Sequence, residues 1–242
     1  MPGGAAAAAG TAPSRPSMVR LARMSELART EEREGEQREW MMRTLAVLQA
    51  PKPVFQALRD DSPAAAAARA EPVLALVIMA GIGALLLLPD ASTALDQSEY
   101  DGTVLAVWLF IVGGILGGAA YWMLGGILYG ASTWLGSLGS YRRARHVLAF
   151  AAAPLALSAF VLLPLRLAFF GSDTFHAGGS DAGTLGTVIA VLGWGFVVWA
   201  AALLLVGVRA VHAWTWQRAA GTVALTVAAV ALVALVRLAL TA

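Results

Sequence analysis

Residues 103–139 read TVLAVWLFIVGGILGGAAYWMLGGILYGASTWLGSLG, and none of them carries a charge. A transmembrane helix needs about 20 apolar residues to cross roughly 30 Å of hydrocarbon. At about 1.5 Å per residue, one helix over this stretch would be about 55 Å long, which is more than a single crossing needs. We predict a helix that crosses the membrane over about residues 103–126 and extends to 139 at the inner interface. A hairpin is the alternative.

The composition of the whole chain is that of a membrane protein. Hydrophobic residues make up 59% of the 242 residues and charged residues only 13%, whereas soluble domains have about 45–50% and 25%. Further apolar runs cover about residues 73–88, 147–170, 185–208 and 219–240. The sequence therefore predicts an all-α fold, an integral membrane helical bundle of five transmembrane helices within a membrane domain over residues 51–242.

The residues before this domain form a tail of different composition. Residues 1–17 contain mainly Gly, Ala, Pro and Ser, which predicts disorder. Residues 18–49 are predicted to be helical, since Met41, Leu45 and Leu48 follow helical spacing. Residues 1–50 are thus expected to be a cytoplasmic tail that is partly disordered and partly helical.

The basic residues set the expected orientation. Lys and Arg are concentrated in the tail, at 142–145, and at Arg209 and Arg218, whereas the stretches 90–102 and 171–184 contain neither. Cytoplasmic loops carry the excess of Lys and Arg. We therefore expect a multi-pass protein of the bacterial cytoplasmic membrane with its N-terminus in the cytoplasm and its C-terminus outside.

Glycines in the second span repeat at intervals of four residues. A glycine has no side chain, so two helix backbones can approach closely there, which favours packing in lipid. We predict that these residues pack helices within the chain, with a homo-oligomer contact as the alternative: Gly113, Gly114, Gly117, Gly118, Gly126 and Gly130.

Two prolines and one arginine stand out in the third span. Pro154 removes a backbone hydrogen bond and should bend or break the helix, and Pro164 is a second candidate kink. We expect small residues of the second span to pack at Pro154. Arg166 lies near the outer end of the span, where its side chain can reach the headgroups. A functional polar role for Arg166 is the alternative.

The sequence offers little reactive chemistry. It has no cysteine, and the predicted spans contain no Asp or Glu of the kind that proton-coupled transporters place inside the membrane. His146, His176 and His212 lack metal-ligand spacing and are expected at interfaces or in solvent. We predict no catalytic, metal or cofactor site. The net charge of +2 does not predict nucleic-acid binding, although the pI is about 9.4.

Several segments resemble the bacterial form of the Yip1 domain family. They are the amphipathic lead PKPVFQAL at 51–58, the stretch LGSYRRARHVLAFAAAPLALS at 138–158, and the short basic link before the last span. The resemblance implies five spans after a cytoplasmic tail. The tail lacks the acidic-Leu-Tyr-Gly-Pro stretch of eukaryotic members, so binding of Rab GTPases is not implied.

Two functions follow from these observations. The first is a non-enzymatic scaffold or adaptor that sits in the lipid bilayer and binds a cytoplasmic protein through its charged tail. The second is a transport component or small-solute permease subunit. A dry, closely packed bundle would favour the first function, and a polar path through the spans would favour the second.

Overall fold

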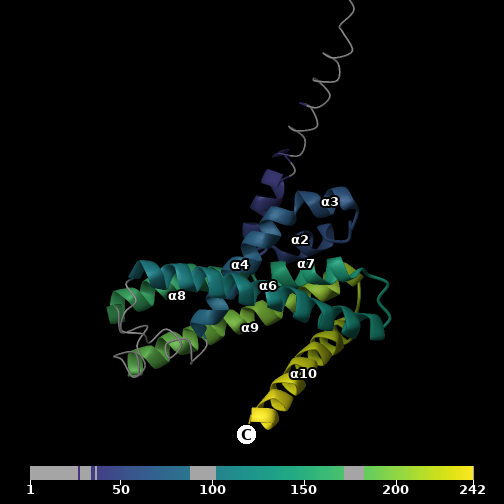
Figure 1. The fold of residues 1–242 in the computed structure, drawn as a ribbon. Coiled ribbons are helices and arrows are strands. Elements are labelled where there is room, and N and C mark those ends of the chain that lie inside the picture. The colour runs from purple at the N-terminus through teal and green to yellow at the C-terminus, as the bar shows by residue number, and fades with distance from the viewer. Residues whose placement is uncertain (1–26, 28–33, 36, 88–101, 172–182, 242) are drawn as a thin grey trace, which may run out of the picture.

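The computed structural model describes residues 27, 34–35, 37–87, 102–171 and 183–241, and its regular elements in these ranges are helices (Figure 1). The predicted all-α fold is confirmed. The predicted disordered segment 1–17, half of the predicted helix 18–49 and nearly all of the two predicted outer loops lie outside the described residues.

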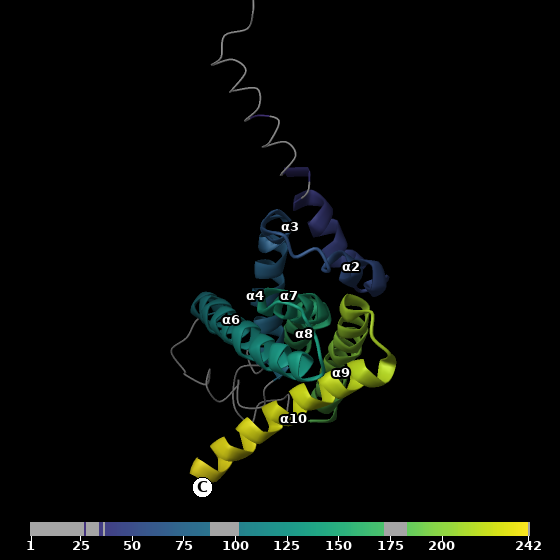
Figure 2. The ribbon, with the colours of Figure 1, turned by 90° about the vertical axis from the view of Figure 1, so that its right-hand side faces the viewer.

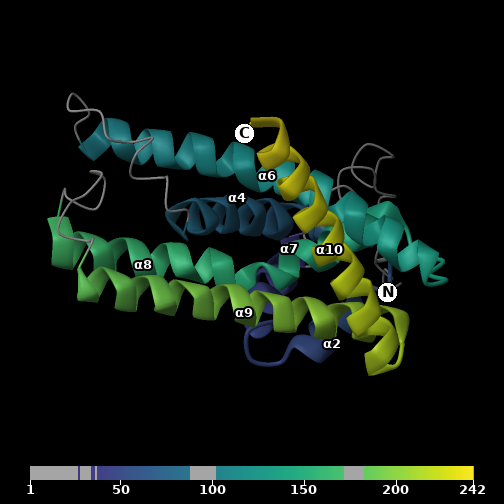
Figure 3. The same cartoon turned by 90° about the horizontal axis from the view of Figure 1, so that it is seen from below.

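Four long helices form the bundle. α4 (Ala70–Leu87), α6 (Gly102–Trp134), α8 (Ala153–Phe170) and α9 (Thr184–His212) run roughly side by side in the order α6, α4, α8, α9 (Figure 3). α4 is apolar around most of its circumference beyond Glu71, as expected of a helix that is covered on several sides. It therefore lies inside the bundle, between α6 and α8.

α10 (Trp216–Thr241) takes a different direction. It begins beside the ends of α6 and α9 and crosses both of them steeply (Figures 1 and 3). Further along the helix its apolar side chains are exposed, among them Val227, Leu232 and Val233.

Five helices are long and apolar enough to cross a membrane. They cover Ala70–Leu87, Val107–Trp134, Tyr141–Phe170, Thr184–His212 and Trp216–Val233. The outward faces of α6, α9 and α10 carry many exposed large apolar side chains, which suit contact with lipid rather than water. The protein is a multi-pass membrane protein.

The long uncharged stretch forms one helix and does not fold back. α6 ends at Trp134, five residues before the predicted 139. Gly136 follows with φ of +85°, a backbone conformation that glycine adopts without a steric penalty. This turn ends the helix and leads the chain into the segment before α7 (Tyr141–Ala151).

The third span is broken near its first proline. α7 ends at Ala151 and α8 begins at Ala153, which places Pro154 in the first turn of α8, where a missing N–H costs little. Gly83 of α4 packs at this point, since a Cβ there would lie 2.0 Å from the carbonyl oxygen of Leu155. The neighbour is thus the first span, and our expectation of the second span was wrong. Pro164 lies within α8, which continues to Phe170.

The segment before α4 folds back onto one end of the bundle. It contains a helix over residues 37–46, α2 (Pro51–Ala57) and α3 (Pro63–Ala68), and we call residues 37–69 the cap. The cap lies over α7 and the last turns of α9 (Figures 1 and 2). We call this end of the bundle the basic end, defined by Arg142, Arg143, Arg145, Arg209 and Arg218.

Candidate functional site

The cap and the basic end meet at Arg69, whose side chain is fully buried. The residue follows α3 and directly precedes α4. Its Nε donates to Nδ1 of His146 at 2.7 Å and its Nη1 to the carbonyl of Asp60 at 2.7 Å. Because Nδ1 of His146 accepts this bond, the ring proton of the neutral imidazole must lie on Nε2.

Asp61 is the anion of the cluster. Its carboxylate lies 3.3 Å from Nη2 of Arg69 and 3.0 Å from Nε of Arg142, and the hydroxyl of Ser140 also donates to it. Burial raises the pKa of Asp61, but the hydrogen bonds from Ser140 and Arg142 outweigh burial and hold the pKa below its usual range. Asp61 therefore stays ionised and joins the cap to the segment before α7.

The aromatic side chain of Trp40 covers this cluster from the cap. Trp40 is buried, with its ring centroid 5.7 Å from that of Phe150 in α7. The guanidinium carbon of Arg69 lies 5.7 Å from the Trp40 ring, and that of Arg43 lies 4.7 Å from it. Trp40 thus fixes the helix over 37–46 to the same cluster, by apolar packing and cation–π contact.

α2 forms the second attachment of the cap. Phe55 is fully buried against Gly207 of α9, where a Cβ would lie 2.8 Å from its ring. Arg59 donates from Nε to the carbonyl of Ala210 at 3.0 Å. A cation at the last carbonyls of a helix satisfies acceptors that have no partner within the helix. The amphipathic lead predicted at 51–58 thus lies on α9.

The predicted glycines separate into those that touch another helix closely and those that do not. A Cβ on Gly113 would lie 2.8 Å from Cα of Ile82, and one on Gly117 would lie 2.1 Å from the carbonyl of Val77. Both therefore allow the close crossing of α6 and α4. Gly114 and Gly126 have only ordinary contacts, and Gly118 and Gly130 have open space around them.

Arg166 lies in α8 and is partly exposed, and no hydrogen bond or ion pair to it occurs among the described residues. The structure does not bring Arg166 to the buried cluster. His146, which we expected at an interface or in solvent, is buried beside Arg69, and that expectation was wrong.

The residues of the buried cluster were not among the predicted sites. A signal for them exists in the sequence: Arg69 is a basic residue at the end of an alanine run, and Asp60 and Asp61 precede the Ser62-Pro63 helix start. Ser62 does cap α3, since its hydroxyl accepts from the backbone N–H of Ala65. What the sequence does not reveal is that the partners come from 140–146.

A known domain family covers most of the described structure. The family model of the Yip1 domain matches residues 45–238, which include α2, α3, the buried cluster and the membrane helices. No curated protein and no solved structure matches the chain. Since the match covers well over half of the residues, the chain belongs to the Yip1 domain family.

Proposed function

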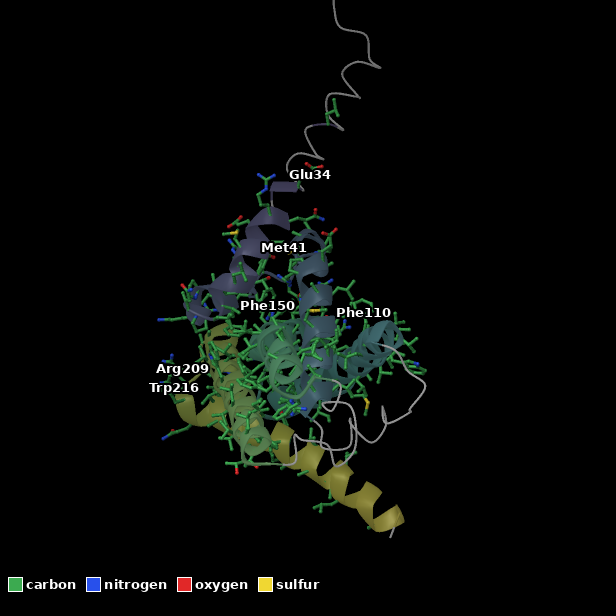
Figure 4. The ribbon with its side chains drawn as sticks, turned by 90° about the vertical axis from the view of Figure 1, so that its left-hand side faces the viewer. Glu34, Met41, Phe110, Phe150, Arg209 and Trp216 are labelled. Carbon is green, nitrogen blue, oxygen red and sulfur yellow. The ribbon has the colours of Figure 1, made fainter. Side chains whose placement is uncertain are left out.

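We propose that this protein is a non-enzymatic membrane scaffold whose cap is a docking surface for another protein. The observation that carries the proposal is that the cap is fixed to the bundle while part of it stays exposed. Arg69, Asp61 and Phe55 attach the cap to the bundle through their contacts with α7 and α9. On the far side of the helix over 37–46, Met41, Met42 and Leu45 are 48%, 64% and 65% exposed. Figure 4 shows Met41 on the cap and Phe150 beneath it in the bundle.

Exposed apolar side chains on a fixed helix are typical of protein-binding surfaces. An amphipathic helix presents such a face to a groove on its partner. Because the cap is already ordered by the buried cluster, binding costs less conformational entropy than binding by a free tail. The rim of the surface is charged, with Glu39 and Arg43 paired across one helical turn. We propose a partner with an apolar groove and polar edges.

The packing of the spans supports a scaffold over a permease subunit. α4 and α6 meet with glycines at their crossing, and α4 meets α8 at Gly83. A cavity between these helices is lined by apolar side chains and Tyr121 and by no charged residue. A hydrated solute needs polar groups along its path, and this cavity does not provide them.

We also propose that the basic end faces the cytoplasm of a bacterial cell and that the C-terminus lies outside. The proposal rests on the arginines at this end. Reporter fusions after Ala213 and at the C-terminus test it. Because α10 crosses the bundle steeply, the C-terminal fusion is the decisive one: a cytoplasmic signal there would leave four crossings.

The scaffold is tested by photo-crosslinking in the host cell. A benzophenone amino acid at Met42 or Leu45 should give a discrete protein adduct, and Met42→Glu should abolish the adduct from position 45. The same probe at Trp134, which is 77% exposed on α6 away from the cap, is the control and should give none. Absence of adducts at both cap positions, together with solute flux through vesicles of the purified protein, would refute the scaffold and favour the permease subunit.

A further inference from the structure

A cavity of about 330 Å³ lies between α4, α6 and the α7–α8 segment. Its size falls within the range of small-molecule sites, about 300–1,000 Å³. Val77, Ala80 and Ala84 line it from α4, and Ala120 and Leu124 line it from α6. These are the helices that form the interior of the membrane bundle, so hydrocarbon is the surrounding solvent.

The cavity reaches the surface of the bundle on the side of α6. Leu116 lines it and is nevertheless 40% exposed. Tyr121, one turn nearer the basic end, is another lining residue. An apolar chain from the bilayer can therefore enter beside Leu116 without crossing a polar layer.

Arg145 lies directly beyond the basic end of this cavity. Its guanidinium carbon is 3.6 Å from the Trp122 ring centroid, 4.6 Å from that of Tyr141 and 5.0 Å from that of Tyr121. Its aliphatic stem crosses α6 at Gly125, where a Cβ would lie 2.3 Å from Cγ of Arg145. The rings orient the guanidinium by cation–π contact but do not neutralise its charge.

This charge has no anion beside it in the described part of the chain. The ion pairs there involve Arg43, Arg69 and Arg142 but not Arg145. Nε of Arg145 is buried and has no hydrogen-bond partner. A buried donor without a partner costs about 1–3 kcal/mol. The oxygens of a phosphate match the planar guanidinium, and phosphate is the anion that the headgroups of a bilayer carry.

Tyr121 joins the two features, because it lines the cavity and also contacts Arg145. On the other wall, Leu148 and Ala149 line the cavity one turn after Arg145 on α7. An apolar cavity that runs toward a lone cation near the helix ends has the layout of a phospholipid, with its chain inside and its headgroup at the interface.

We propose that the cavity holds an acyl chain of an anionic phospholipid whose phosphate binds the guanidinium of Arg145. This site does not depend on the docking role of the cap.

Native mass spectrometry of the full-length protein tests the site. The delipidated protein is titrated with phosphatidylglycerol, which is anionic, or with phosphatidylcholine, which is zwitterionic. Phosphatidylglycerol should form a one-to-one adduct that survives detergent removal and should bind at least tenfold more tightly than phosphatidylcholine.

Two pairs of variants separate the chain site from the headgroup site. Ala120→Phe fills the cavity and should weaken binding of both lipids at least tenfold, whereas Ala119→Phe, on the exposed face of α6, should not. Arg145→Gln should remove the preference for phosphatidylglycerol. Arg209→Gln is its control. Arg209 likewise lies over an aromatic ring, that of Trp216, and has a buried Nε (Figure 4). Unlike Arg145, it does not lie beside a residue that lines the cavity.

The outcomes decide the proposal. Equal lipid binding by the Ala120→Phe and Ala119→Phe proteins would overturn the cavity as the site of the acyl chain. If Ala120→Phe does not fold, Ala84→Phe repeats the test from the opposite wall of the cavity. Equal affinity for the two lipids, or an unchanged preference in Arg145→Gln, would overturn Arg145 as the headgroup site. An adduct with phosphatidylcholine alone would also overturn Arg145 as the headgroup site.

Discussion

The substitution Asp61→Asn tests whether the buried cluster holds the cap on the bundle. Asp61 is 11% exposed and its partner Arg69 is 0% exposed. Removing one partner of a buried ion pair costs about 3–5 kcal/mol, because the other charge stays buried without compensation. Arg69 keeps its bonds to His146 and Asp60, and asparagine can still accept one bond, so we expect the lower end, about 3 kcal/mol. This corresponds to about a 100-fold larger population of detached cap.

Native-state proteolysis measures that population. Cleavage of the cap by a nonspecific protease in detergent or nanodiscs follows the open fraction when closing is faster than cleavage. The rate for Asp61→Asn should therefore rise about 100-fold. The matched control is Glu39→Gln, which breaks the exposed pair with Arg43 and should cost at most about 0.5 kcal/mol. Equal cleavage rates for the two variants would refute the role of the cluster.

The pH dependence gives an independent readout of Asp61. Its pKa is lower in the folded protein than in the unfolded chain, so its contribution is present above the unfolded value of about 4 and is lost as the pH falls through the folded value. The contribution of Asp61 to cap closure, read as the difference between the wild-type protein and Asp61→Asn, should be constant from about pH 8 to 5 and should fall below about pH 4. The profile of Asp61→Asn should be flatter. Asp60, whose pKa is also lowered, titrates in the same window, so the difference between the two profiles isolates Asp61.

Four further substitutions test the packing of the bundle by thermal unfolding in detergent. Gly117→Ala places a Cβ 2.1 Å from the carbonyl of Val77 and should destabilise the protein by about 1–3 kcal/mol. Gly118→Ala is the control and should be neutral or stabilising, because Gly118 has open space around it. The opposite ranking would contradict the crossing of α4 and α6 described here. Ala213 ends α9 with φ of +53°, so Ala213→Gly should stabilise by about 0.5–1 kcal/mol, and a lower melting temperature would count against this cap. Pro154→Ala should change stability by less than about 1 kcal/mol, because the proline lies in the first turn of α8, and a loss of several kcal/mol would mean that the proline itself maintains the break.

The helical fold and the membrane location were predictable because they depend on local composition. An uncharged run such as 103–139 cannot be accommodated in water, and its length alone indicates a helix that spans a bilayer. The break in the third span was also predictable to within two residues, since a proline affects its own turn and the residue before it.

Contacts between distant segments were not predictable in the same way. Which glycines of α6 meet α4 closely depends on where the helices cross, and among the predicted glycines these are Gly113 and Gly117. Gly125, which accommodates the stem of Arg145, was not among the predicted residues. Arg69 looks like one more basic residue of the tail until its partners at 140–146 are known. A positive charge beside a span satisfies the orientation rule whether it is buried or solvated.

The buried cluster is better understood as a device for specificity than as a source of stability. Arg69 and Asp61 each lose solvation on burial, and their attraction roughly offsets this loss in a typical protein. Yet the bonds to His146, Ser140 and Arg142 can all form in only one placement of the cap against α7. Apolar contacts such as that of Phe55 with α9 attract the cap without fixing its register, because they depend little on direction. Apolar packing therefore brings the cap to the bundle, and the charged cluster selects the one orientation in which Met41, Met42 and Leu45 face outward.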